Sequence, residues 1–173
     1  MAEIGDRPAG LSAPAPLTSA HDVSRFDCEK PALNDWLRNS ASESEGRTAR
    51  TYVVCASDRA VVGYYCISTG SVERRALPAK MKRAQGLPHQ VPVAIIGRLA
   101  RDKAYAGKGL GKDLLQDALR RILTASRIVG VRAVLVHALD EEAAKFWTAH
   151  EFIECPIGSR TFYLPVETIT GAV

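Results

Sequence analysis

A glycine-rich turn between an apolar strand and a long amphipathic helix is the feature that most constrains the fold of this chain. The strand candidate covers residues 92–100, the turn reads GKGLGK over residues 107–112, and the helix is expected over residues 109–125. Glycines allow a ligand to approach the backbone closely, and the first N–H groups of a helix lack partners within it. Such a turn is typical of a phosphate site, although an ordinary flexible turn has the same composition.

Two well-known phosphate loops are excluded by spacing. The GxxxxGK[S/T] loop fails because Asp113 follows Lys112, where serine or threonine is required. The GxGxxG loop, counted from Gly107, fails because Lys112 occupies the place of the third glycine. The turn therefore belongs to neither of these nucleotide-binding classes.

The order of the predicted elements indicates an α/β fold with a mixed sheet. A buried-type strand over residues 131–138 follows the long helix, and a strand–helix–strand order implies a parallel pair with a right-handed crossover. Strands over residues 51–55 and 61–67 are close enough in sequence to form a hairpin. The other expected elements are a helix from Pro31, a short helix between Pro78 and Gly86, a helix capped by Asp140 and a last strand over residues 161–166.

Length and composition indicate one globular domain. The chain has 173 residues, of which 46% are hydrophobic and 24% charged, and these values are typical of globular proteins. Residues 1–16, rich in Pro, Ala and Gly, are expected to form a flexible arm before a single domain over residues 17–173. The sequence shows no secretory signal and no membrane-spanning run, so a cytoplasmic location without membrane contact is expected.

Cysteines, histidines and net charge narrow the classes of ligand. The four cysteines are widely spaced without a CxxC pair, so we expect no metal site and interpret the thiols as small buried groups. His137 lies in a buried-type strand and is interpreted as a core histidine, whereas His150 ends a helix. The net charge of +4 indicates an anionic partner without separating nucleic acid from a phosphorylated cofactor.

The segments at residues 97–102 and 106–111, with the helix after them, resemble the acetyl-coenzyme A motif of the GNAT superfamily of N-acetyltransferases. Gly109 and Gly111 match that motif, and Ala106 stands at its Gln/Arg position. The resemblance implies a GNAT fold, which is a mixed, mostly antiparallel sheet with a central splayed parallel strand pair flanked by helices. It also implies acetyl-CoA as cofactor, with these binding residues: Leu99, Ala100, Arg101, Ala106, Gly107, Lys108, Gly109, Leu110, Gly111, Lys112 and Phe146.

Further segments resemble one branch of that superfamily, the acetyltransferase toxins of bacterial toxin–antitoxin pairs. They lie at residues 21–28, 33–37, 50–54, 62–65 and 97–100, and the likeness extends over residues 17–169. The resemblance implies acetylation of the α-amine of aminoacyl-tRNA, which blocks translation. It further implies a ribbon-helix-helix antitoxin as partner and a homodimer.

The resemblance also suggests how the reaction proceeds. The pantetheine arm would pair with the splayed strands, and an N–H near Leu99 or Ala100 would donate to the thioester oxygen. The family places a tyrosine in a Phe-Tyr-x-x-x-Gly-Phe helix to protonate the leaving thiolate, but here Trp147 follows Phe146. Trp147 could pack against the cofactor or in the core, and Tyr163, Tyr105 or water could supply the proton.

Basic residues outside the turn are either a solvated face or contacts to tRNA phosphates. They are Lys30, Arg74, Arg75, Lys80, Lys82 and Arg83. Two other functions stay open. One is an acetyltransferase of a small amine or a protein N-terminus. The other is a catalytically weakened relative, disabled at Trp147, that acts as an antitoxin-binding partner.

Overall fold

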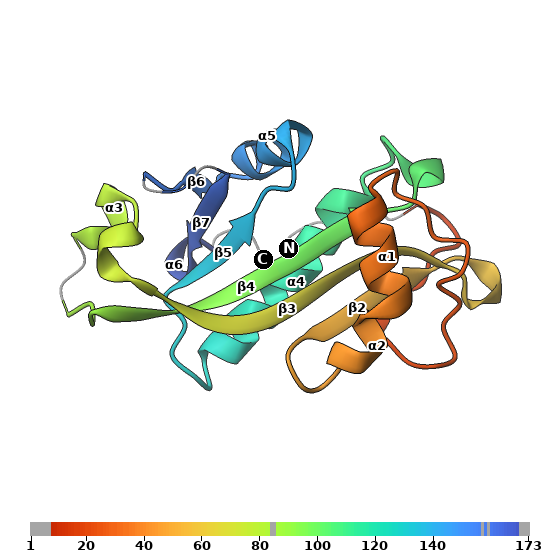
Figure 1. Ribbon diagram of the computed structural model, residues 1–173, viewed down its shortest axis with the longest axis horizontal. Helices are drawn as coiled ribbons and strands as arrows, with labels where there is room; N and C mark the ends of the chain where they lie inside the picture. Colours follow the sequence, from red (N-terminus) through yellow and green to blue (C-terminus); the bar gives the residue numbers. More distant parts are fainter. Residues whose placement is uncertain (1–7, 84–85, 157, 159, 170–173) are drawn as a thin grey trace. The chain divides into compact units, whose positions relative to one another are not determined.

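A seven-stranded mixed sheet forms the centre of the computed structural model, which describes residues 8–83, 86–156, 158 and 160–169. The pair β4–β5 is parallel, with Val93 opposite Ala133 and Ile96 opposite Val136. The predicted mixed sheet with a parallel pair is therefore confirmed (Figure 1). Across the sheet the strands are β1 (Ala15–Pro16), β2 (Arg50–Cys55), β3 (Val61–Glu73), β4 (Gln90–Arg101), β5 (Ala133–His137), β7 (Thr161–Pro165) and β6 (Ile153–Glu154).

Helices connect and flank these strands, and the predicted ones are confirmed. Pro31 opens the first helix, where its missing N–H removes no hydrogen bond. The Asp140 side chain caps α5 by accepting a hydrogen bond of 2.9 Å from the Ala143 N–H. The helices are α1 (Pro31–Asn39), α2 (Ala41–Ser44), α3 (Ala79–Lys82), α4 (Leu110–Ser126), α5 (Glu141–Ala149) and α6 (Val166–Ile169), with 3₁₀ turns η1 (Ser57–Arg59), η2 (Arg74–Ala76) and η3 (Lys103–Tyr105).

The chain divides into two compact units. The first contains Met1–Ser68 and Gly97–Leu119. In it, α1 packs on one face of the strands, where the Tyr64 hydroxyl donates to the Leu33 carbonyl at 2.8 Å. The other face carries α4, and an added Cβ on Gly63 would lie 3.1 Å from the Leu114 side chain. Figure 1 shows α1 in front of β2 and β3, and α4 behind them.

The second unit contains Thr69–Ile96 and Arg120–Val173. Its strand β5 is central, with β4 on one side and β7 on the other, where Leu135 lies opposite Tyr163. The Cys155 thiol donates to the Ala76 carbonyl at 2.9 Å and so ties β6 to η2. One cluster of buried residues forms a hydrophobic core in this unit. It consists of Leu77, Met81, Val91, Val93, Ala133, Leu135, Cys155 and Tyr163.

The end of the expected flexible arm is attached to the sheet. The Ser12 N–H donates to the Cys55 carbonyl and the Ser12 hydroxyl accepts from the Cys55 N–H, both at 2.9 Å. Strand β1 then pairs with β2, so the exposed edge of β2 gains partners. Residues 1–7 of the expected arm lie outside the described residues. The division into an arm and one domain stays a prediction.

His137 is exposed, so the prediction of a core histidine is wrong. It ends β5 beyond the last parallel pair, Ile96 opposite Val136, so no residue of β4 is paired with it. Its Nδ1 lies 2.9 Å from the Thr161 hydroxyl oxygen of β7. No helix among the described residues has the length and apolar character needed to cross a membrane.

Candidate active site

The glycine-rich turn joins β4 to α4 through the 3₁₀ turn η3. Asp102 starts η3, because its side chain accepts a hydrogen bond of 2.9 Å from the Ala104 N–H. Gly107 and Gly109 have φ angles of 71° and 79°, in the left-handed region that favours glycine. The Asp113 N–H donates to the Gly109 carbonyl at 3.1 Å, the first turn of α4. The chain thus reverses and enters the helix at Gly109.

This geometry suits the pyrophosphate of acetyl-CoA. An added Cβ at Gly107 or Gly109 would meet no atom within 4 Å, so the backbone there faces open space. The first N–H groups of α4 have no partner inside the helix, and its dipole favours an anion at this end. Lys108 and Lys112 are exposed beside the turn and add positive charge. The residues present therefore fit a phosphorylated cofactor.

Side chains of the predicted cofactor set divide between exposed and buried positions. Leu110 is 0% exposed and lies over Gly63, so only its backbone is available to a ligand. Ala100 is buried, whereas Leu99 and Arg101 are half-buried. Lys108 places its ammonium 5.4 Å from the centre of the Tyr105 ring. The residues from Leu99 to Lys112 form one continuous segment of the first unit, and Phe146 belongs to the second.

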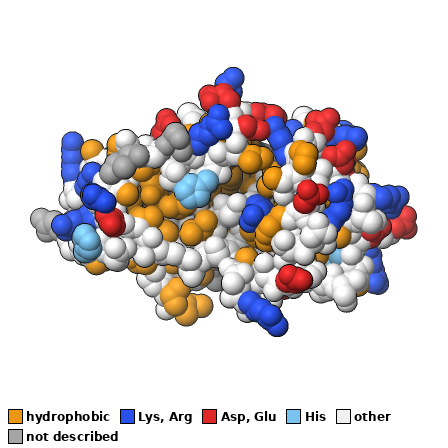
Figure 2. Space-filling model, in the orientation of Figure 1, with side chains coloured by type: hydrophobic (Ala, Val, Ile, Leu, Met, Phe, Trp, Pro, Cys, Tyr) orange, Lys and Arg blue, Asp and Glu red, His pale blue; other side chains and the backbone are white. Residues whose placement is uncertain are grey.

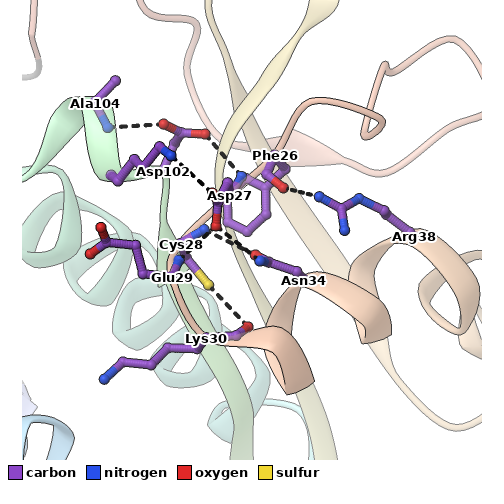
Figure 3. Close-up of polar contacts among 10 residues, drawn as sticks. Phe26, Asp27, Cys28, Glu29, Lys30, Asn34, Arg38, Asp102 and Ala104 are labelled. Atoms are coloured by element: carbon purple, nitrogen blue, oxygen red, sulfur yellow. Dashed lines mark hydrogen bonds and ion pairs between the residues drawn. The ribbon is translucent and has the colours of Figure 1, made fainter.

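A polar network anchors this turn to the segment before α1 (Figure 3). Asp102 accepts from the Asp27 N–H at 3.0 Å, and the Lys103 N–H donates to the Asp27 carbonyl at 2.9 Å. The Lys103 ammonium also lies 3.1 Å from the Asp27 carboxylate. Hydrogen bonds from the Glu29 N–H, followed by Lys103 and Asn34, hold the pKa of Asp27 at about 2. Two segments distant in sequence are therefore fixed to each other at the entrance to the turn.

Asn34 carries the network into α1. Its amide nitrogen donates to Asp27 at 3.1 Å, and its amide oxygen accepts from the Cys28 N–H at 2.9 Å. Arg38, one turn later, donates to the Phe26 carbonyl. The sequence reading did not single out Asp27, Asn34 or Asp102. One available indication was the spacing of Asn34, Leu37 and Ala41, which puts a polar side chain in line with buried apolar ones.

Trp147, at the position of the family's tyrosine, and Tyr163, one of the possible proton donors, belong to the second unit. Trp147 is 5% exposed, with its ring centre 5.0 Å from that of Phe146 and 5.1 Å from that of Phe152. Tyr163 is 2% exposed, and burial, followed by the neighbouring Cys155, raises its pKa to about 12. Both side chains therefore contribute to packing in this unit.

The predicted tRNA-binding cations are placed on a solvent-facing segment, apart from Lys30, which precedes α1 in the first unit. Leu77 and Met81 anchor this segment in the core, and the charged side chains around them are exposed. Figure 2 shows Lys and Arg side chains gathered around α3. Two cations have protein partners, since Arg75 pairs with Glu73 and Arg74 donates to the Leu87 carbonyl at 3.3 Å. The exposed set is Arg74, Arg75, Lys80, Lys82 and Arg83.

Three of the four cysteines are held as thiols and not as nucleophilic thiolates. Burial raises the pKa of the thiols of Cys28, Cys55 and Cys66, so they stay protonated at neutral pH. Among the residues that the structure covers, no group of three or more His, Cys, Asp or Glu side chains could hold a metal ion.

The fold and the turn together define the class: an α/β protein with a phosphate-type loop at the start of the helix that follows the first strand of a parallel pair. The chain belongs to the acetyltransferase (GNAT) family, whose model matches residues 17–152. Enzymes of this family use acetyl-CoA. The fold, the enzyme class and the cofactor expected from the sequence are thereby confirmed.

Similar proteins cover nearly the whole chain. A tRNA-acetylating toxin of Mycobacterium tuberculosis (strain ATCC 25618 / H37Rv) is 39% identical over 145 residues, which are 83% of this chain and 86% of the relative. A solved structure of AtaT complexed with acetyl-methionyl-tRNAfMet is 31% identical, with a TM-score of 0.85 over 92% of this chain and 97% of that one. A tyrosine-to-phenylalanine mutant of AtaT, bound to the C-terminus of the antitoxin AtaR and acetyl-CoA, is 30% identical, with a TM-score of 0.78 over 92% and 96% of the two chains.

Proposed function

We propose that this enzyme transfers the acetyl group of acetyl-CoA to the α-amine of aminoacyl-tRNA and thereby blocks translation. The observation that carries the proposal is the relationship, along 83% of the chain, to a tRNA-acetylating toxin. Support also comes from AtaT, a structural neighbour that has been captured with acetyl-methionyl-tRNAfMet. The exposed cations around α3 give this chain a surface suited to RNA phosphates.

In this proposal backbone N–H groups bind the cofactor and stabilise the charge that develops in the reaction. Acetyl-CoA supplies an activated thioester when it is bound. The N–H groups at the start of α4, with Gly107 and Gly109, hold the pyrophosphate. An N–H of Leu99 or Ala100 donates to the oxygen on which negative charge develops. The α-amine has a pKa of about 7.7–8.0, against about 10.4 for lysine, so a fraction of it is unprotonated at neutral pH, and this free amine attacks directly.

The source of the proton for the leaving thiolate sets this chain apart from the family pattern. An indole N–H is a hydrogen-bond donor but not a useful acid, so we assign Trp147 a packing role. The burial and raised pKa of Tyr163 weigh against it as the donor. Tyr105, half-buried directly before the glycine-rich turn, or water is then the donor. A thiol of pKa about 8.5 leaves readily enough for turnover to be slow rather than absent.

The proposal extends to partners and place. AtaT binds the C-terminus of the antitoxin AtaR, and we propose an antitoxin of the ribbon-helix-helix type for this chain. We further propose a homodimer acting in the cytoplasm, where aminoacyl-tRNA is found. Size-exclusion chromatography with light scattering, alone and with the candidate antitoxin, tests both assemblies.

Radiolabelled acetyl-CoA tests the activity itself. The enzyme is incubated with aminoacyl-tRNA, with the same tRNA after deacylation, with free amino acid amides and with N-terminal peptides. We expect label only where an aminoacyl ester carries a free α-amine on tRNA. Equal labelling of amides or peptides would instead favour an acetyltransferase of small amines or protein N-termini. Absence of labelling from every acceptor would favour a catalytically inactive antitoxin-binding protein.

A further inference from the structure

Arg98 of β4 lies in a layered arrangement of side chains in the first unit. Its guanidinium carbon is 4.5 Å from the centre of the Trp36 ring of α1. Trp36 in turn stacks on Tyr64 of β3, with ring centres 5.9 Å apart and an angle of 11° between the planes. The Tyr64 hydroxyl is fixed by its 2.8 Å hydrogen bond to Leu33. The cation is thus held against a rigid aromatic surface.

The positive charge of Arg98 is not neutralised by the protein around it. Arg98 is half-buried, and no carboxylate within the described part of the chain forms an ion pair with it. Its other polar neighbour is the Cys66 thiol. Burial raises the pKa of this thiol, and the nearby Arg98 opposes that shift. Because a partly desolvated cation without an anion is costly, this position is suited to an anionic ligand.

The form of the cation narrows the ligand to a phosphate next to a base. A guanidinium placed over an aromatic ring can still donate N–H groups to the two oxygens of a phosphate, because it carries five N–H donors. Trp36 is itself half-buried, and proteins bind unpaired RNA bases by stacking them on aromatic rings and Arg planes. Arg98 also directly precedes Leu99 and Ala100, the proposed oxyanion donors. An RNA end whose amine reacts at that position carries its last phosphate close by.

We propose that Arg98, supported by Trp36, binds the backbone phosphate of the 3′-terminal nucleotide of the acceptor tRNA. This inference rests on the proposed function, because only an aminoacyl-tRNA acceptor brings such a phosphate to β4. Arg98 then contributes to the KM for tRNA and not to the binding of acetyl-CoA.

Two substitutions of Arg98 test the assignment, with exposed Arg47 as matched control. For Arg98→Gln we expect a KM for aminoacyl-tRNA at least about 10-fold higher, the loss typical of a charged hydrogen bond. The salt dependence of tRNA binding should fall by about one phosphate contact. Arg98→Lys should restore the salt dependence and only part of the KM, since an ammonium lacks the planar fork. Arg47→Gln should match the wild type.

Binding of acetyl-CoA, measured by calorimetry, separates the possible outcomes. It should be unchanged in both Arg98 variants. A loss of acetyl-CoA affinity would overturn the inference by assigning the cation to the cofactor. A loss of antitoxin binding alone would overturn it in favour of a protein carboxylate. Wild-type protein that labels amides but never aminoacyl-tRNA would refute the proposed function and this inference together, whereas normal tRNA kinetics in Arg98→Gln would refute this inference only.

Discussion

Gly109 occupies a backbone conformation that an L-residue adopts only with strain. Its φ is 79°, and an added Cβ would project into open space where the pyrophosphate is proposed to lie. Gly10 offers a matched control in the same unit, with a φ of 85° and no atom within 4 Å of an added Cβ. The two positions share the backbone cost and differ only in their relation to the turn.

We therefore expect Gly109→Ala and Gly10→Ala to lower the free energy of unfolding by similar amounts, about 1–2 kcal/mol each. Only Gly109→Ala should weaken acetyl-CoA binding, by about 10-fold or more, since its methyl group blocks close approach to the backbone. Thermal unfolding and calorimetry measure the two effects. Equal acetyl-CoA affinity in both variants would remove the phosphate-loop assignment.

Trp147 is the residue at which this chain departs from the family's tyrosine. Both Trp147→Tyr and Trp147→Phe leave a gap between Phe146 and Phe152 and should be less stable than the wild type. At saturating acetyl-CoA we expect Trp147→Tyr to acetylate about 10²-fold faster than Trp147→Phe, the lower end of a general-acid effect. Single-turnover kinetics on the two folded variants make the comparison. A tyrosine variant no faster than the phenylalanine one would mean that a hydroxyl at this position does not protonate the thiolate, and the rate of Tyr105→Phe would be measured next.

At the scale of elements, the network around Asp27 joins the segment before α1 to η3. Because the pKa of Asp27 is lowered to about 2, its ionised form stabilises the fold above about pH 4. That contribution is lost as the pH falls from about 4 to about 2. Asp27→Asn removes it at every pH.

The difference in free energy of unfolding between wild type and Asp27→Asn should be constant above pH 4 and shrink toward pH 2. Denaturant titrations at several pH values measure it. Exposed Asp35 on α1 is the control, and Asp35→Asn should stay close to the wild type throughout. A difference for Asp27→Asn that does not change below pH 4 would show that the carboxylate is not the group that holds the network together.

A separate prediction concerns the binding of tRNA by the basic segment around α3. Reversal of Arg74 and Lys82 to Glu leaves the core contacts of Leu77 and Met81 in place. If both cations contact tRNA phosphates, affinity should fall and the dependence of binding on salt should flatten by about two contacts. Filter binding at several salt concentrations measures this, and an unchanged dependence would mean that the segment is only solvated.

Elements with a strong local pattern were predictable from the sequence. The four-residue spacing in α4 and the capping by Asp140 gave helices that the structure contains. The two-residue strands β1 and β6 were missed, because each is too short to show a period and forms only by pairing with a neighbour. Strand β3 was expected to end earlier than Glu73, because its last part includes Thr69, Gly70 and Ser71.

The candidate site was predictable only in part, because some of its residues are brought together by the fold of the whole molecule. The glycine-rich turn is contiguous, so its role follows from local chemistry. Asp27 and Asp102, in contrast, are 75 positions apart in the sequence. Arg98 meets Trp36 only because α1 packs on the face of the sheet from which the Arg98 side chain projects. The exposure of His137 likewise depends on where the parallel pairing stops, which no local pattern encodes.

Acetylation of the α-amine on tRNA is the central claim, and mass spectrometry of the product tests it most directly. Enzyme, acetyl-CoA and total aminoacyl-tRNA are incubated, the RNA is digested, and the masses of the aminoacyl-adenosine fragments are measured. The account predicts a mass increase of one acetyl group on the amino acid of one or more aminoacyl-adenosines, and none on the nucleoside. Unmodified aminoacyl-adenosines, alongside acetylation of free amines or peptides by the same preparation, would contradict it.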